Sequence, residues 1–184
     1  MPGHAAEKLM PVEEFLSFED GTDTRYELID GHLRAMAPPS EAHGTVVSNL
    51  IASLKRHLPP GCRVVAEAGI RPPAGSDWNY WQADLIVTCT GRARDGQGLS
   101  APVLVVEVLS PSTMDHDRGR KVPGYTTLPS VRYILLVGSE DRWVQHWSRQ
   151  ADGWFVRDVI GQGEVMPACL NGTAITLDDL YEGV

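Results

Sequence analysis

Cysteine is scarce in this chain, and the three cysteines, Cys62, Cys89 and Cys169, lie far apart in the sequence. None of them belongs to a CxxC pair, so the sequence indicates neither a zinc knuckle nor a disulfide framework. No apolar stretch reaches the length that spans a membrane, and the N-terminal MPGHAAEKLM lacks the apolar core of a signal peptide. We therefore expect a cytoplasmic protein with no membrane contact.

Positive charge is also in short supply. The 184 residues contain 16 Lys and Arg against 24 Asp and Glu, a formal net charge of -8. This balance argues against a protein that coats nucleic acid nonspecifically, but it leaves room for a nuclease whose site is locally basic or neutralised by metal. The length and the hydrophobic content of 42% suit one domain. We expect residues 1–9 to be a loose tail and residues 10–184 to form that domain.

The clearest helix pattern runs from about Glu41 to Leu58. Ser40 precedes it as a candidate N-cap, and Pro59-Pro60-Gly61 ends it. Apolar residues recur at helical spacing along one face: Val47, Leu50, Ile51, Leu54 and Leu58. Shorter helices are expected at 11–18 and 177–181, and the segment 114–128 reads as two helical pieces because Pro123-Gly124 interrupts it.

Three apolar runs have strand length and no polar face, which is typical of strands buried on both sides. They are expected at 80–88, 102–109 and 131–137, with a further strand at 62–70. Two antiparallel hairpins are indicated by turn dipeptides, Asp30-Gly31 and Asp152-Gly153. The first joins strands expected at 25–29 and 32–37, and the second joins strands at 142–149 and 154–160.

Two of the buried strands each contain one carboxylate, Asp84 and Glu107. An ionised carboxylate inside a buried strand is costly unless it is paired or bound to metal. Taken singly, Asp84 is explained as the start of a strand and Glu107 as half of a buried salt bridge. Neighbouring strands are only about 4.8 Å apart, so the two together would converge on one hard cation, Mg²⁺, Mn²⁺ or Ca²⁺.

A basic cluster, Arg118-Gly119-Arg120-Lys121, follows these strands. Lys121 is our candidate for orienting or deprotonating an attacking water and for offsetting charge on a phosphoryl transition state. The alternative is a solvated helix lysine. Arg118 and Arg120 are weaker candidates, for steering phosphate or as surface residues.

Two further residues are candidates. Glu27 would supply a third metal ligand, or would equally well lie on the outward face of an alternating strand. His43 lies in the first turn of the long helix, where the helix dipole favours phosphate, so it would contact a phosphate oxygen or the leaving group. The alternative is a helix-start histidine with no role.

These residues resemble the Uma-two family of the PD-(D/E)xK restriction-endonuclease-like superfamily over about residues 10–182. The resemblance rests on Arg25 to Gly31, on Pro38-Pro39-Ser40 with His43, on Asp84 to Val87, on Val106 to Thr113, and on Asp117 to Lys121 with Tyr125. It implies an α/β (α+β) fold, with a restriction-endonuclease-like mixed central sheet flanked by helices and an antiparallel hairpin extension.

The resemblance also implies a function. Asp84 and Glu107 would bind Mg²⁺ or Mn²⁺, and Glu27 would be the acidic residue that such folds contribute before the core strands. Ala83 replaces the superfamily's proline, and Leu109 stands two residues after Glu107 where a lysine is expected. The catalytic lysine would then come from the following helix, at Lys121.

The implied protein is a divalent-metal-dependent endonuclease that hydrolyses phosphodiester bonds, with DNA as the expected partner. A homodimer is compatible with this, because enzymes that cut both strands often need two sites, and the Trp-rich hairpin would offer an interface. Two rivals stay open. One is a weak or inactive nuclease-fold module that binds nucleic acid or a protein partner, and the other is a metal-dependent hydrolase of a small molecule.

Overall fold

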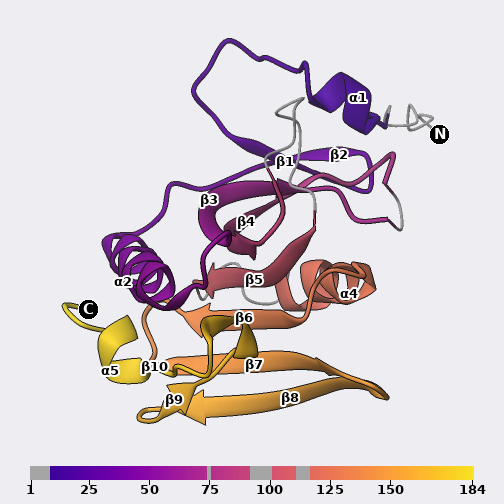
Figure 1. The fold of residues 1–184 in the computed structure, drawn as a ribbon. Coiled ribbons are helices and arrows are strands. Elements are labelled where there is room, and N and C mark those ends of the chain that lie inside the picture. Colours follow the sequence, from indigo (N-terminus) through magenta and orange to yellow (C-terminus); the bar gives the residue numbers. More distant parts are fainter. Residues whose placement is uncertain (1–8, 74–75, 92–100, 111–116) are drawn as a thin grey trace.

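A six-stranded mixed sheet forms the centre of the molecule (Figure 1). The computed structural model describes residues 9–73, 76–91, 101–110 and 117–184. The strands follow the spatial order β3 (Arg63–Ile70), β4 (Trp81–Thr88), β5 (Pro102–Leu109), β6 (Tyr133–Gly138), β7 (Trp143–Gln150) and β8 (Gly153–Ile160). Only β5 and β6 pair in parallel among these neighbours. The predicted fold class is confirmed, including the antiparallel hairpin β7–β8 at one edge.

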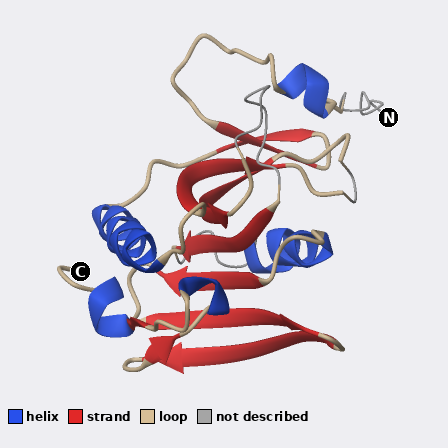
Figure 2. Ribbon diagram, in the orientation of Figure 1, coloured by secondary structure: helices blue, strands red, loops and turns tan. Residues whose placement is uncertain are grey.

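The middle strands are buried on both faces, as their apolar runs predicted. Helix α2 (Glu41–His57) and the short helix α5 (Leu177–Leu180) pack with one face of the sheet. Helix α4 (Val122–Thr127) packs with the other face, and Figure 2 shows α2 and α5 close together at the left of the strands and α4 at the right. Because the helices exclude water from both faces, any charged side chain on a middle strand must find its partner inside the protein.

Helix α2 begins as predicted. The Ser40 hydroxyl accepts a hydrogen bond from the backbone N–H of His43 at 3.2 Å, so Ser40 is the N-cap. Val46, Leu50 and Leu54 are fully buried on the face toward the sheet. The cap therefore fixes His43 in the first turn, at the end of the helix nearest the strand carboxylates.

The β1–β2 hairpin lies beside β4 at the top of Figure 1. It pairs β1 (Tyr26–Ile29) with β2 (His32–Ala35). Asp30 and Gly31 both have positive φ, 49° and 81°, as a tight two-residue hairpin turn requires. A reciprocal pair of backbone hydrogen bonds between Leu28 and Tyr80 fastens the hairpin to the start of β4. Helix α1 (Val12–Phe15) is shorter than the helix predicted at 11–18.

The β7–β8 hairpin forms one edge of the sheet, and its outer strand exposes apolar residues. Ile160 is 76% exposed and Phe155 is 58% exposed. Trp143, Trp147 and Trp154 instead pack partly buried against the core cluster that contains α4. A homodimer through this hairpin stays a prediction.

The cysteine prediction was wrong. Cys62 and Cys89 form a disulfide, while Cys169 is free. The antiparallel register pairs Arg63 with Thr88, so the two cysteines stand at the next position outward on neighbouring strands. Sequence spacing alone does not report such a cross-strand pairing. No helix among the described residues is both long and apolar enough to cross a membrane.

Some expected features lie outside the described residues. These are most of the tail at 1–9, most of the loop at 91–98, and the start of the broken helix at 114–116. Within the described part, the broken helix is a π-helical turn, η1 (Asp117–Lys121), that runs directly into α4. Three short elements were not predicted: β9 (Glu164–Val165), η2 (Ala168–Leu170) and β10 (Ile175–Thr176).

Candidate active site

Asp84 and Glu107 stand opposite each other on neighbouring strands. The β4–β5 register pairs Leu85 with Val106, so the next position outward pairs Asp84 with Glu107. There the backbone ladder stops, and the Val108 N–H donates at 2.6 Å to Asp84 Oδ2. Both carboxylates line a cavity of about 590 Å³. The structure thus brings together the two carboxylates that the sequence analysis paired.

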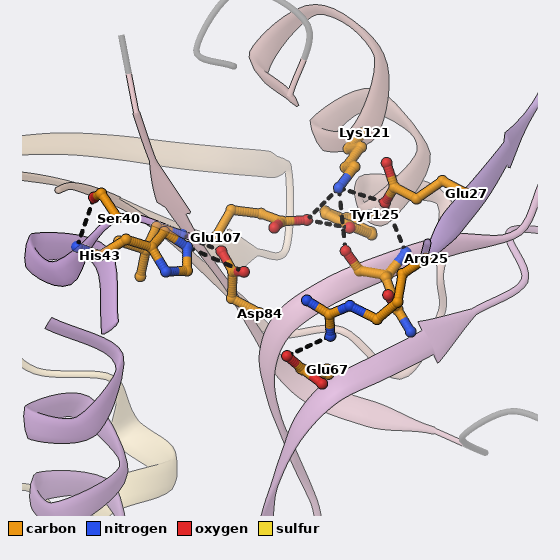
Figure 3. A network of polar contacts seen from close by, with 11 residues as sticks. Arg25, Glu27, Ser40, His43, Glu67, Asp84, Glu107, Lys121 and Tyr125 are labelled. Atoms are coloured by element: carbon orange, nitrogen blue, oxygen red, sulfur yellow. Dashed lines mark hydrogen bonds and ion pairs between the residues drawn. The ribbon is translucent and has the colours of Figure 1, made fainter. Parts of the chain in front are cut away.

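Lys121 approaches this pair from the side of α4 (Figure 3). Its Nζ lies 2.7 Å from Glu27 Oε1 and 3.4 Å from Glu107 Oε1, and it donates to the Gln82 carbonyl at 3.1 Å. The lysine is only 4% exposed. The alternative of a solvated lysine was therefore wrong, because this ammonium is buried between two glutamates.

Close packing behind Lys121 fixes its position. At Gly124 an added Cβ would lie 2.0 Å from the Trp81 ring, so only glycine lets α4 come this near to β4. Pro123 is tolerated because it sits in the first turn of α4. The neighbouring Tyr125 packs edge-on against Trp81, with ring centroids 5.5 Å apart.

Tyr125 also acts on the site directly, because its hydroxyl donates a hydrogen bond to Glu107 Oε1. Tyr125 is completely buried and Glu107 is 3% exposed. A charged carboxylate gains more from such a bond than a neutral acceptor does. The sequence analysis included Tyr125 in the family pattern but gave it no role. Its spacing of four residues from Lys121, one helical turn, was the available signal.

Glu27 comes from β1 and is 5% exposed. Its Oε1 accepts the Gln82 N–H at 2.8 Å as well as contacting Lys121. The alternative of an outward-facing strand residue was wrong. A role as third metal ligand stays a prediction. No group of three or more His, Cys, Asp or Glu side chains among the described residues is already arranged to hold a metal.

His43 lies on the opposite side of the carboxylate pair from Lys121 in Figure 3. Its Nε2 is 3.3 Å from Asp84 Oδ1, and both side chains are largely but not completely buried. Helix α2 thus supplies a histidine, and the turn η1 before α4 supplies a lysine, to carboxylates on the strands between them. All five predicted site residues lie around one cavity.

Four charged residues that the sequence analysis did not select as site residues also line the cavity: Arg25, Arg34, Glu67 and Glu140. Glu67 interrupts β3 with a φ of 51°, between the register pairs Ala66–Leu85 and Ala68–Ala83, and so stands opposite Asp84. Its carboxylate forms an ion pair with Arg25. No sequence pattern predicts that a non-glycine residue such as Glu67 adopts a left-handed backbone conformation inside a strand. For Arg25 the sequence offered one signal, because it stands two residues before Glu27, just ahead of β1.

Charge in the cavity is unbalanced. Among the described residues that line it, five carboxylates (Glu27, Glu67, Asp84, Glu107 and Glu140) meet three cationic side chains (Arg25, Arg34 and Lys121). The formal charge is therefore -2 with His43 neutral. One divalent cation would neutralise this lining, and hard oxygen donors are the ligands that Mg²⁺ and Mn²⁺ prefer.

The sequence matches a family model over residues 12–178, and the family is described as "Putative restriction endonuclease". The chain belongs to the Uma2 family. The predicted resemblance is thereby confirmed for nearly the whole described domain.

Relatives of the Uma2 chain include two proteins of Synechocystis sp. The uncharacterized protein slr1290 is 31% identical over 179 residues, which cover 96% of this chain and 93% of that protein. The uncharacterized protein sll1609 is 24% identical over 162 residues, covering 86% and 92%. A crystal structure described as a putative nuclease belonging to DUF820, from Anabaena variabilis, superimposes with a TM-score of 0.76 at 17% identity. It covers 94% of this chain and 98% of its own. This likeness shows a shared fold.

Proposed function

We propose that this Uma2 protein is a divalent-metal-dependent endonuclease that hydrolyses phosphodiester bonds of DNA. The observation that carries the proposal is the facing pair Asp84 and Glu107, with the buried Lys121 ammonium 3.4 Å from Glu107. Paired carboxylates beside a lysine supply a cation site and a positive charge for one phosphoryl group. The family description supports the same reaction class.

The residues present fit Mg²⁺ or Mn²⁺. Such ions keep several waters and usually take one or two carboxylates from the protein, so Asp84 and Glu107 are sufficient protein ligands. Glu27 is held by Lys121 in this structure and would join them only after that contact loosens. A bound ion would lower the pKa of a water ligand and stabilise charge that develops on the phosphoryl group.

The remaining roles follow from position. The Gln82 carbonyl and Glu27 hold Lys121 Nζ at the wall of the cavity, where it orients the attacking water and offsets negative charge. Tyr125 keeps the Glu107 carboxylate oriented. His43, 3.3 Å from Asp84, is placed to contact a phosphate oxygen or the leaving group. Each polar group is fixed by packing before substrate arrives, which is what transition-state stabilisation requires.

One observation favours a second candidate, a nuclease-fold module that binds nucleic acid or a protein without cutting. Lys121 already contacts both Glu27 and Glu107, so the buried acids are compensated by the protein's own cation. In that case the lysine and glutamates serve stability and the cavity binds without hydrolysis.

The deciding experiment incubates supercoiled plasmid DNA with the protein and Mn²⁺ or Mg²⁺. Mutating residues that only hold metal ligands in place typically lowers metal affinity or activity about 10–100-fold. Asp84→Asn removes the charge of a proposed ligand itself, so it should lower the cleavage rate by at least that factor. Calorimetry should show metal binding by the wild type and its loss in Asp84→Asn. Asp158→Asn, on the exposed hairpin strand β8 away from the cavity, is the matched control and should cleave as the wild type does.

Three outcomes separate the candidates. Cleavage that Asp84→Asn abolishes supports the endonuclease. Metal and DNA binding without strand cleavage selects the binding module. Hydrolysis of bis(p-nitrophenyl) phosphate with no effect on plasmid DNA would instead point to a small phosphodiester as substrate.

A further inference from the structure

Arg34 lies on the wall shared by two cavities. It lines the 590 Å³ cavity that contains the carboxylates and also a second cavity of about 460 Å³. The β1–β2 register places Arg34 directly opposite Glu27, so both side chains leave the same face of the hairpin. Glu27 reaches inward to Lys121 from this face. Arg34 therefore stands beside the catalytic cavity, on the side that leads to the second one.

Arg34 is partly buried, yet nothing in the described part of the chain forms an ion pair or hydrogen bond with its guanidinium. The two neighbouring arginines are different, because Arg25 pairs with Glu67 and Arg120 pairs with Asp30. A guanidinium has five N–H donors in a planar fork, and those of Arg34 are available to a ligand in either cavity. A phosphodiester presents two oxygens in the geometry that this fork binds.

The second cavity has further basic side chains in its lining besides Arg34. Its lining includes His32, next along that face of β2, and Arg120 from η1. The same lining contains Asp30, which pairs with Arg120, so two arginines and one carboxylate give it a formal charge of +1 with His32 neutral, against -2 for the carboxylate cavity. A single small phosphate would fill only one cavity. A polyanionic strand would fill both and place successive phosphates along the basic side chains.

We propose that Arg34 binds a backbone phosphate of the DNA that flanks the phosphodiester held at Asp84 and Glu107, and that the strand leaves the catalytic cavity across β2 into the second cavity. This inference rests on the proposed function for its substrate class. Arg34 is a positioning residue in this proposal, since it touches a neighbouring phosphate and leaves the reacting one to Asp84, Glu107 and Lys121.

The test measures binding separately from hydrolysis. Fluorescence anisotropy follows a labelled DNA duplex titrated with protein, in EDTA and in Ca²⁺, over a series of salt concentrations. Arg34→Ala should weaken binding about 10–100-fold, as expected for a lost charge-assisted contact. The slope of log affinity against log salt should fall by about one, as expected for one lost phosphate contact. Arg34→Lys should keep the salt slope and lose only part of the affinity, because a point charge replaces the bidentate fork.

Arg56→Ala is the matched control. It removes the same charge from the exposed end of α2, and Arg56 lines neither cavity. It should bind DNA as the wild type does. Wild-type affinity and salt slope in Arg34→Ala would overturn the proposal, as would a wild-type protein that binds no DNA in either buffer.

The two proposals fail in different ways. If the wild type binds DNA without cutting it, and Arg34→Ala loses affinity, the proposed phosphate contact is supported and the proposed hydrolysis is refuted. If the wild type cuts DNA and Arg34→Ala cuts it with unchanged KM, the proposed hydrolysis is supported and the proposed phosphate contact is refuted. If both stand, Arg34→Ala should raise KM and leave kcat nearly unchanged at saturating DNA, because the reacting phosphate keeps its own contacts.

Discussion

Lys121 Nζ lies 2.7 Å from Glu27 Oε1, and only 5% and 6% of the two side chains are exposed. The lysine comes from η1, between β5 and β6 in the chain, and the glutamate comes from the N-terminal hairpin. This ion pair therefore fastens the hairpin to the body of the domain while it positions the ammonium beside Glu107. Stability and the proposed chemistry depend on the same atoms.

Replacing the lysine should show this dependence. Lys121→Met keeps most of the side-chain volume but leaves Glu27 and Glu107 as buried carboxylates without their cation. Removing one partner of a buried pair typically costs about 3–5 kcal/mol, so the free energy of unfolding should fall by that amount. Urea unfolding followed by Trp fluorescence measures it.

The double variant Lys121→Met with Glu27→Gln is the control for this prediction. It removes one of the stranded charges, so its loss should be smaller than the sum of the two single losses, with a coupling of about 0.5–3 kcal/mol. A Lys121→Met protein as stable as the wild type would show that the pair is hydrated in solution.

Tyr125→Phe should distinguish the contribution of the Tyr125 hydroxyl from that of its ring. The ring still packs against Trp81, but Glu107 loses a donor in a buried setting. A hydrogen bond to a charged group typically contributes about 1.5–3 kcal/mol, and stability should fall within that range. Calorimetry should also show altered affinity for Mn²⁺, because the orientation of Glu107 is less restricted. Tyr133→Phe removes a hydroxyl with no hydrogen bond among the described residues, and it should leave both measurements nearly unchanged.

The disulfide should change two measurable quantities, the number of titratable thiols and the free energy of unfolding. Denatured protein should contain one titratable thiol before reduction and three afterwards, because only Cys169 is free. Burial raises the pKa of the Cys169 thiol to about 11, so the native protein should react slowly with thiol reagents near neutral pH.

Reduction opens a loop between residues 27 positions apart. The chain-entropy relation predicts a loss of about 3–4 kcal/mol for a loop of this length. The Cys62→Ser, Cys89→Ser double variant should show the same loss and become insensitive to reductant. Three thiols in unreduced, denatured protein would contradict the pairing.

His146 should make stability depend on pH. Its burial on β7 lowers the pKa of its imidazole, and the nearby Arg157 lowers it further. In the unfolded chain this histidine gains a proton as pH falls below about 6.5, whereas the folded protein resists protonation until lower pH. The unfolded state then binds more protons, so stability should decline as pH falls through that window and level off once the folded histidine also titrates.

His146→Phe keeps an aromatic ring beside Tyr133 and removes the titration. Its melting temperature should change less between neutral and mildly acidic pH than that of the wild type. Arg157→Gln should reduce the dependence in part, because it removes the smaller of the two causes. An identical pH profile in His146→Phe and the wild type would refute the assignment.

Local patterns were enough for most of the fold. The helix from Glu41, its Ser40 cap and the buried strands around Asp84 and Glu107 were all predicted, because periodicity reports burial and capping chemistry acts within a few residues. The Asp30-Gly31 turn was predicted for the same reason, since its positive φ values are a local demand. The length of α1 was not predicted, because tertiary packing decides where such a short helix ends.

Patterns in the sequence were sufficient to identify the buried strands, the two acids on them and Lys121 as a candidate cation. The contacts of Lys121 with Glu27 and Glu107 depend on strand register and on the close approach of Gly124 to Trp81, which no local pattern reports. Register likewise joined Cys62 to Cys89 and left Arg34 between two cavities. The physical reason is that periodicity encodes how far a residue is from water, whereas the identity of its neighbours depends on packing between segments distant in the chain.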